Sequence, residues 1–110
     1  MSAQPTPAFD AVIHAPGRLQ ICAILSSVDN AEFAMLRDAI KVSDSVMSKH
    51  LKQLEEAGHV TLTKAAENGR QRTWIALSPS GRKAFAAHVA ELQRLAAMTA
   101  PPPLGQGFSG

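Results

Sequence analysis

The amino-acid sequence predicts a mainly helical domain that carries one small β-hairpin. Apolar residues recur at helical spacing in several segments, most clearly at Met47, Leu51 and Leu54. Farther along the chain the pattern changes to strict alternation, which is typical of half-buried strands. Two alternating runs flank Asn68-Gly69, a dipeptide that strongly favours a tight hairpin turn. The predicted fold class is therefore α+β, with the hairpin as the minor component.

Composition and charge indicate one globular domain but do not identify its partner. The chain has 110 residues, of which 45% are hydrophobic and 18% are charged, and this is enough for a single core. The net charge of +2 does not by itself require nucleic acid, so the positions of the charges matter more. There is no signal-peptide pattern, no apolar run of membrane-spanning length, and a single cysteine. We expect a cytoplasmic protein without membrane contact, in which Cys22 is a core thiol and not a redox sensor.

The N-terminal part is predicted to contain an arm, a short apolar turn and one helix. Residues 1–8 hold two prolines and little apolar surface, which predicts a flexible arm. Residues 9–13 are expected to form a short apolar turn, and Pro16 suits the first turn of a helix over 16–27. Apolar side chains spread around most of this helix. Because one small core cannot cover such a surface, we expect a partner subunit to cover part of it.

Two short helices joined by a tight turn are predicted next. Residues 31–33 form either a brief strand or the start of the first helix, with a capping box. Residues 34–40 continue as an amphipathic helix whose apolar face is formed by Phe33, Leu36 and Ile40. Lys41 occupies the turn, where glycine is more common.

The second of these helices is the centre of the prediction. Ser43 is a good N-cap and Gly58 a good residue for ending the helix. The buried stripe is formed by Met47, Leu51, Leu54 and Ala57. The opposite face is polar, apolar or cationic and has no acid before Glu55; it consists of Ser45, Val46, Lys49, Lys52 and Gln53. A neutral-to-basic start, with the positive end of the helix dipole forward, suits a polyanion, so we interpret this as a DNA-recognition helix.

A basic hairpin directly follows this helix. Pairing Glu67 with Arg70 places four aliphatic side chains on one face, those of Val60, Leu62, Ile75 and Leu77. Lys64, Arg70 and Arg72 gather near its tip. Trp74 is predicted on the opposite face, packed on a neighbouring helix or a partner subunit. Together these elements predict a winged helix-turn-helix.

The last helix is predicted over 79–98 and begins at Ser78-Pro79, a cap followed by proline at the first helical position. Its apolar residues form a seam that requires another helix. We expect a homodimer interface made by this seam and the earlier helix, through Leu19, Phe85, Val89, Leu92 and Ala96. Residues 99–110 are rich in proline and glycine and are predicted to be disordered.

Four stretches resemble the short winged-helix regulators related to the MarR and ArsR families. Residues 15–21 resemble P-x-R-L-x-I, residues 43–51 S-x-S-x-x-S-[KR]-H-L, residues 54–58 L-E-E-A-G, and residues 77–82 L-[ST]-P-x-G-R. They occur in the order of the family and cover nearly all of residues 9–98. The resemblance implies a homodimeric transcriptional regulator that binds palindromic operator DNA through its central helix and wing.

The residue types suggest how the contacts with DNA are shared. Base edges are expected to be contacted by Ser45, Val46 and Lys49. The serine hydroxyl can donate or accept a hydrogen bond, Val46 can contact a thymine methyl group, and Lys49 can reach O6 and N7 of guanine. Ser43, Ser48 and Lys52 are expected to hold phosphates. The wing residues Lys64, Arg70 and Arg72 complete the predicted interface, with the two arginines at the minor groove or its phosphates. His50 is either a structural histidine bonded to nearby backbone or a phosphate contact.

Other functions find less support in the sequence. No Ser/His/Asp or Cys/His set shares a motif, no glycine-rich phosphate loop follows a strand, and the carboxylates are scattered. We therefore predict no enzyme and expect no cofactor. His88 and Glu91 have half of a metal-site spacing, but no further cysteine or histidine completes it, so no metal is predicted. We predict a repressor. The alternatives are a winged-helix module that binds protein, and a regulator of the same fold that responds to a metal or to a small-molecule effector.

Overall fold

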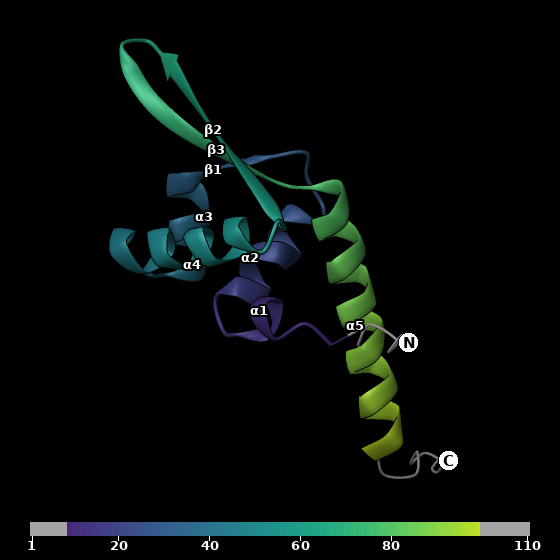
Figure 1. Ribbon diagram of the computed structural model, residues 1–110. Coiled ribbons are helices and arrows are strands. Elements are labelled where there is room, and N and C mark those ends of the chain that lie inside the picture. The colour runs from purple at the N-terminus through teal and green to yellow at the C-terminus, as the bar shows by residue number, and fades with distance from the viewer. Residues whose placement is uncertain (1–8, 100–110) are drawn as a thin grey trace, which may run out of the picture.

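The computed structural model describes residues 9–99, which form five helices and a three-stranded antiparallel sheet (Figure 1). The elements in chain order are α1 (Ala11–His14), α2 (Arg18–Leu25), β1 (Ala31–Glu32), α3 (Phe33–Ile40), α4 (Asp44–Glu56), β2 (Val60–Glu67), β3 (Arg70–Leu77) and α5 (Pro79–Thr99). This order confirms the predicted fold class. The predicted arm over 1–8 and the tail from residue 100 lie outside the described residues, whereas Thr99, assigned to the tail, ends α5.

The helix predicted over 16–27 is shorter than expected, because a sharp turn precedes it. Pro16 lies in this turn and not at the first helical position, and Gly17 has a φ of 86°. A Cβ atom on Gly17 would come within 2.5 Å of the His50 imidazole. The chain therefore turns at the one residue that permits both the positive φ and the close approach of α4.

The helix-turn-helix forms from the local signals expected of it. Residues 31–32 adopt the strand alternative, and Lys41 closes the turn in the left-handed conformation with a φ of 61°. Ser43 caps α4, its Oγ accepting the Val46 N–H at 3.2 Å. Met47, Leu51 and Leu54 are buried as predicted. Ala57 is exposed, which corrects its predicted place in the buried stripe: α4 ends at Glu56, and the chain leaves the helix direction there.

The hairpin has the predicted register. Val60 pairs with Leu77, Leu62 with Ile75, and Glu67 with Arg70. Asn68 and Gly69 both have positive φ, as a two-residue hairpin turn requires. The strand order is β1-β3-β2, so β3 is the central strand, and β1 pairs with it only at Trp74 and Ile75. The rest of the hairpin projects from the body as a two-stranded ribbon (Figure 1).

The long helix α5 begins as predicted and then leaves the body. Ser78 Oγ accepts the Gly81 N–H at 2.9 Å, and Gly81 lies against the backbone of His59, where a Cβ would come within 2.0 Å of the carbonyl oxygen. The distal half of α5 extends past α1 into solvent (Figure 1). The Cα radius of gyration is 17.4 Å, against about 13 Å for a compact domain of about 100 residues.

A single core joins α1–α4 to the sheet, and it contains Cys22 as predicted. The Cys22 side chain is fully buried, and burial raises the pKa of its thiol to about 11. A thiol that stays protonated at neutral pH is a poor nucleophile. In residues 9–99 no helix is long and apolar enough to cross a membrane.

Candidate nucleic-acid interface

The outer face of α4 presents the three residues that were expected to contact bases. Ser45, Val46 and Lys49 are exposed, and Val46 keeps 41% of its surface accessible although it is aliphatic. They lie opposite the buried stripe at spacings that place them on one helical face. Ser43 and Ser45 share a hydrogen bond of 3.2 Å between their hydroxyl oxygens, so the capping end of α4 presents two hydroxyl groups beside free helix amides.

The one acid in the first turn of α4 is neutralised. Arg37 of α3 donates to Asp44 at 2.7 Å and to Asp38 at 2.9 Å. These contacts, led by the hydrogen bond with Asp38, hold the pKa of Arg37 above its ordinary value. The ion pair joins the two helices across their turn. It also balances a carboxylate that would otherwise repel a phosphate at the helix start.

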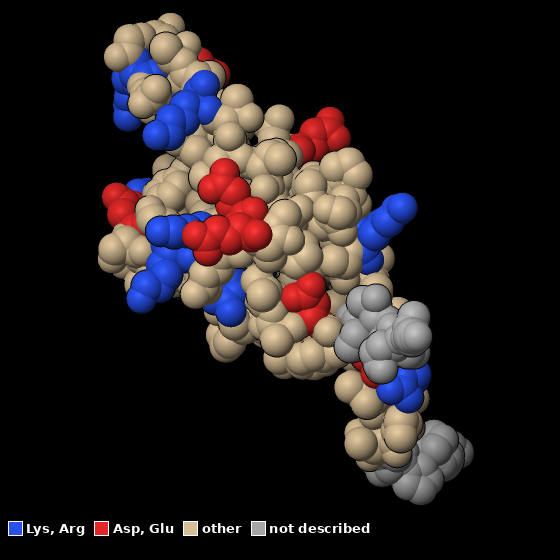
Figure 2. All heavy atoms as spheres, viewed as in Figure 1, with Lys and Arg blue, Asp and Glu red and all other residues tan. Residues whose placement is uncertain are grey.

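A groove separates α4 from the wing, and cations from both elements line it. Ser48 and Lys52 of α4 face Lys64 of β2 across this groove, whose further lining residues are Phe33, Leu51, Glu55, Glu56, Leu62 and Thr73. Figure 2 shows the resulting pattern, with basic side chains on the wing and over α4 and acidic ones between them. Three of the predicted DNA-binding residues therefore come together in the structure, beside two carboxylates at the end of α4.

The two wing arginines have different surroundings. Arg70 is exposed near the turn, and within residues 9–99 no carboxylate lies at ion-pair distance from it. Arg72 is half-buried, and its Nη1 donates to both carboxylate oxygens of Glu32 at 3.0 Å. The sequence contains no local signal for this pair, because Glu32 and Arg72 are 40 positions apart.

His50 packs against the turn before α2, and the alternative of a phosphate contact stays a prediction. Its ring packs on Gly17, and its Nδ1 is buried without a hydrogen-bond partner in the described part of the chain. Burial, followed by the charges of Arg18 and Lys49, lowers the pKa of His50. The predicted bond to nearby backbone is therefore absent at Nδ1, and the imidazole fills the space beside Gly17 instead.

The predicted dimer seam is divided between two environments. Phe85 and Val89 line an apolar hollow on α5 together with Ser26, Arg82, Ala86, Ala90 and Gln93. Leu92 is half-buried and Ala96 is exposed. Leu19 is half-buried against the core of its own chain and does not line this hollow.

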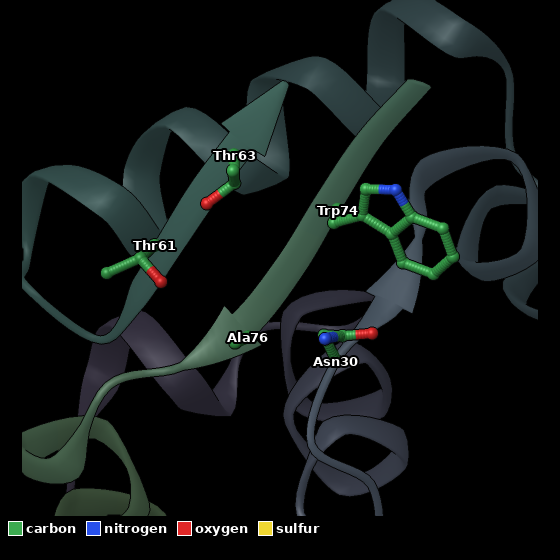
Figure 3. A pocket seen from close by; sticks show the side chains of 5 residues that line it. All are labelled: Asn30, Thr61, Thr63, Trp74 and Ala76. Carbon is green, nitrogen blue, oxygen red and sulfur yellow. The ribbon is translucent and has the colours of Figure 1, made fainter. Parts of the chain in front are cut away.

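Trp74 lies on the outer face of the sheet, as its position in the strand predicts. Figure 3 shows it beside Asn30, with Thr61, Thr63 and Ala76 completing a shallow hollow. The lining residues come from β2, β3 and the loop before β1, so within residues 9–99 no helix covers this hollow. The expected packing on a neighbouring helix is therefore not found in the lining of this hollow, and packing on a partner subunit stays a prediction.

A polar cluster that sequence reasoning missed joins α1 to α5. Asp10 caps α1 through its Oδ1, and its Oδ2 lies 2.9 Å from His59 Nε2. The Asp10 N–H donates to Nδ1 of the fully buried His88, whose Nε2 lies 3.1 Å from His14 Nδ1. Asp10 before a short apolar helix was the one available signal. Glu91 pairs with Arg94 instead, so the half-site spacing of His88 and Glu91 does not correspond to a shared ligand set.

The comparison with known families settles the class of this domain. A family model described as a winged helix DNA-binding domain matches residues 18–96. The chain belongs to this family. The family is one of DNA-binding domains and not of enzymes, in agreement with the sequence-based expectation. An uncharacterized protein of Methanocaldococcus jannaschii is 35% identical over 78 residues, covering 71% of this chain and 85% of the relative.

Solved structures share the fold. A transcriptional regulator homologue from Pyrococcus horikoshii OT3 superposes with a TM-score of 0.77 at 20% identity, covering 82% of this chain and 89% of the other. A MarR family transcriptional regulator from Silicibacter pomeroyi DSS gives a TM-score of 0.62 at 19% identity. That match covers 86% of this chain and 62% of the regulator. The fold is therefore that of MarR-type transcriptional regulators.

Proposed function

We propose that this winged-helix protein is a homodimeric transcriptional repressor that reads a near-palindromic operator. The observation that carries the proposal is the arrangement of α4 and the wing. An exposed face of α4 without unbalanced acids in its first turns continues across a cation-lined groove to the hairpin. A helix for the major groove beside a hairpin for the flanking backbone is the arrangement that duplex DNA requires.

The proposed contacts fall into two kinds. Ser45, Val46 and Lys49 read base edges in the major groove, because they form the exposed centre of the α4 face. Phosphates are held by residues around this centre, namely Ser43, Ser48, Lys52 and Lys64. Arg70, exposed near the tip of the wing, reaches the minor groove or its phosphates.

The pairing of two copies is proposed on α5. The first half of this helix packs on the body, but its apolar hollow around Phe85 and Val89 faces solvent, and Met98 keeps 69% of its surface exposed. A second copy of α5 would bury this surface. Two recognition helices related by a two-fold axis would then lie about 34 Å apart, one turn of DNA. Occupying an operator excludes other proteins from it, which is the basis for proposing repression.

Selection from a pool of random duplexes at fixed salt tests the proposal. We expect enrichment of a two-fold symmetric motif, bound by a species of dimer mass. The proposal would be contradicted if the protein bound every duplex weakly and if this binding did not depend on salt concentration. That result would favour a protein-binding module instead.

A further inference from the structure

An ion-pair ladder crosses the outer face of the sheet at the base of the wing. Arg72 lies on the central strand β3, Glu32 on β1 at one side and Glu67 on β2 at the other. The register places Glu32 opposite Trp74 and Glu67 opposite Arg70, so each carboxylate is a diagonal neighbour of Arg72 on the same face. Arg72 Nη1 donates to both oxygens of Glu32 at 3.0 Å, and its Nε lies 3.4 Å from Glu67 Oε1.

This ladder lies where the sheet narrows. β1 contributes two residues and pairs with β3 only at Trp74 and Ile75. Beyond Trp74, toward the turn, the wing is a two-stranded ribbon, a form that twists more freely than a three-stranded sheet. Arg72 is two residues past Trp74, the last position that pairs with β1, and its side chain reaches back to Glu32. The pair therefore ties the start of the free ribbon to the strand that precedes α3.

The two arginines of the wing differ in exposure and in charged neighbours. Arg70 has an exposed side chain, and none of the ion pairs among residues 9–99 includes it. The charge of Arg72 is balanced by two carboxylates, and only 32% of its side-chain surface is accessible. Binding a phosphate through Nη1 would require Arg72 to release Glu32, because this nitrogen donates to both oxygens of the carboxylate.

We propose that Arg72 is a positioning residue, which sets the angle of the wing on DNA by pairing with Glu32, while Arg70 makes the contact with DNA. This inference rests on the proposed DNA-binding function. It assigns Glu32 a role in DNA binding that its negative charge alone would not suggest, because removing an acid from a DNA-binding protein ordinarily strengthens binding.

The test compares Arg72→Gln with Glu32→Gln on the selected operator. If the pair positions the wing, both substitutions weaken binding in the same direction, by about five-fold. The salt slope of each stays near that of the wild type, because no phosphate contact is lost. Arg70→Gln is the contact control and lowers the slope by about one. Asp29→Asn, an exposed acid in the preceding turn, is the control for loss of a negative charge.

A charge swap gives a second readout. Glu32→Arg combined with Arg72→Glu restores an ion pair at the same place with the same net charge. The positioning role predicts that the swapped protein recovers most of the affinity lost in either single variant. A contact of Arg72 with DNA predicts the opposite, because the swapped protein has a glutamate at position 72 whatever stands at position 32.

Hydrogen exchange of the free protein separates this inference from the proposed function. We expect faster exchange of the wing amides in residues 64–73 in both single variants, with exchange of α4 unchanged. Tighter operator binding by Glu32→Gln than by Asp29→Asn, with a lowered slope for Arg72→Gln, would overturn the positioning role, as would wild-type exchange and affinity in both variants. If the wild type bound no duplex but both variants still showed faster exchange of the wing amides, the DNA-binding function would be refuted. The structural link between Arg72 and Glu32 would then still hold.

Discussion

Lys49 and Arg70 carry the same charge, but they lie on elements that meet different parts of a duplex. Lys49 is exposed on the face of α4 between Val46 and Lys52, whereas Arg70 is exposed beside the turn of the wing. A cation that reaches guanine O6 and N7 discriminates between sequences, and a cation on a phosphate does not. At the scale of single residues, the proposed function therefore separates side chains by what they touch and not by charge.

Lys49→Ala is expected to reduce the preference for the operator over random DNA by about tenfold, because each good base contact contributes roughly 1–3 kcal/mol of discrimination. Arg70→Ala should weaken binding to both duplexes by a similar factor and flatten the salt dependence. Titrations of both DNAs at several salt concentrations measure the two effects. Equal losses on operator and random DNA for Lys49→Ala would exclude its role in base reading.

His88 makes the stability of the fold depend on pH. Its Nδ1 accepts the Asp10 N–H, and burial, then the nearby His14, lowers the pKa of His88 below 6.5, while Asp10 opposes this shift. The unfolded chain therefore binds the proton more strongly than the folded chain. Stability is fully present above the unfolded pKa and is lost as the pH falls from 6.5 through the lower folded pKa.

His88→Asn keeps an acceptor for the Asp10 N–H but removes the titrating ring. We expect it to cost about 1–3 kcal/mol near pH 8, because the ring fills buried space. We also expect a smaller loss of stability between about pH 8 and pH 5 than in the wild type. Urea unfolding at both pH values measures this. His50 shifts in the same direction, so part of the pH dependence should remain in the variant.

At the scale of elements, two glycines with similar backbone angles have different surroundings. Gly17 precedes α2 with a φ of 86°, and Gly58 follows α4 with a φ of 80°. The space for a Cβ at Gly17 is occupied by the His50 ring at 2.5 Å, whereas nothing lies within 4 Å at Gly58. The angle between α2 and α4 therefore depends on Gly17 in a way that the end of α4 does not depend on Gly58.

Gly58→Ala should cost only the backbone strain, about 1–2 kcal/mol. Gly17→Ala should cost more, because it adds the contact with His50 to the same strain. Unfolding of both variants in denaturant gives the comparison. Adding His50→Ala to each tests the mechanism, since it should recover stability only in the Gly17→Ala background. Equal costs at the two glycines would show that the His50 ring moves away freely.

At the scale of the whole molecule, the elongated shape follows from two projecting elements. The wing extends beyond β1, and the distal half of α5 extends beyond the body (Figure 1). The sheet and α1–α4 share one core, and Phe85 of α5 packs against its edge. The hollow that Phe85 lines with Val89 is open to solvent, with Ala86 and Ala90 exposed beside them. An apolar surface on a helix this long is the part of the molecule where a second copy would contribute most.

Ala90→Glu should shift the protein from dimer to monomer, because it places a charge in the hollow while keeping a good helix former. Ala87→Glu makes the same change at an exposed position of α5 that does not line the hollow, and it should leave the dimer intact. Sedimentation over a range of concentrations measures the difference. Identical behaviour of the two variants would place the dimer interface elsewhere.

The sequence by itself determined the parts of the molecule whose causes are local. The cap at Ser43, the buried residues Met47, Leu51 and Leu54 of α4, and the register fixed by Asn68-Gly69 follow from residues a few positions apart. All of these match the structure, whereas Ala57, predicted in the same stripe, is exposed. The predicted contacts on α4 and the wing are also a local inference. The structure places Ser48, Lys52 and Lys64 around one groove, while the DNA contacts themselves stay a prediction.

The tertiary structure decided what depends on residues far apart in the chain. Position 17 requires glycine because the His50 ring occupies the space of a Cβ atom. His88 is buried where Asp10 and His14 contact its two ring nitrogens. From the sequence alone, Arg72 is one more cation of a basic wing. The fold brings Glu32, 40 positions away, beside it. No local spacing pattern predicts these contacts, because each forms where elements that are distant in sequence pack together. The role of a charged side chain therefore depends on the oppositely charged group that the tertiary structure places beside it.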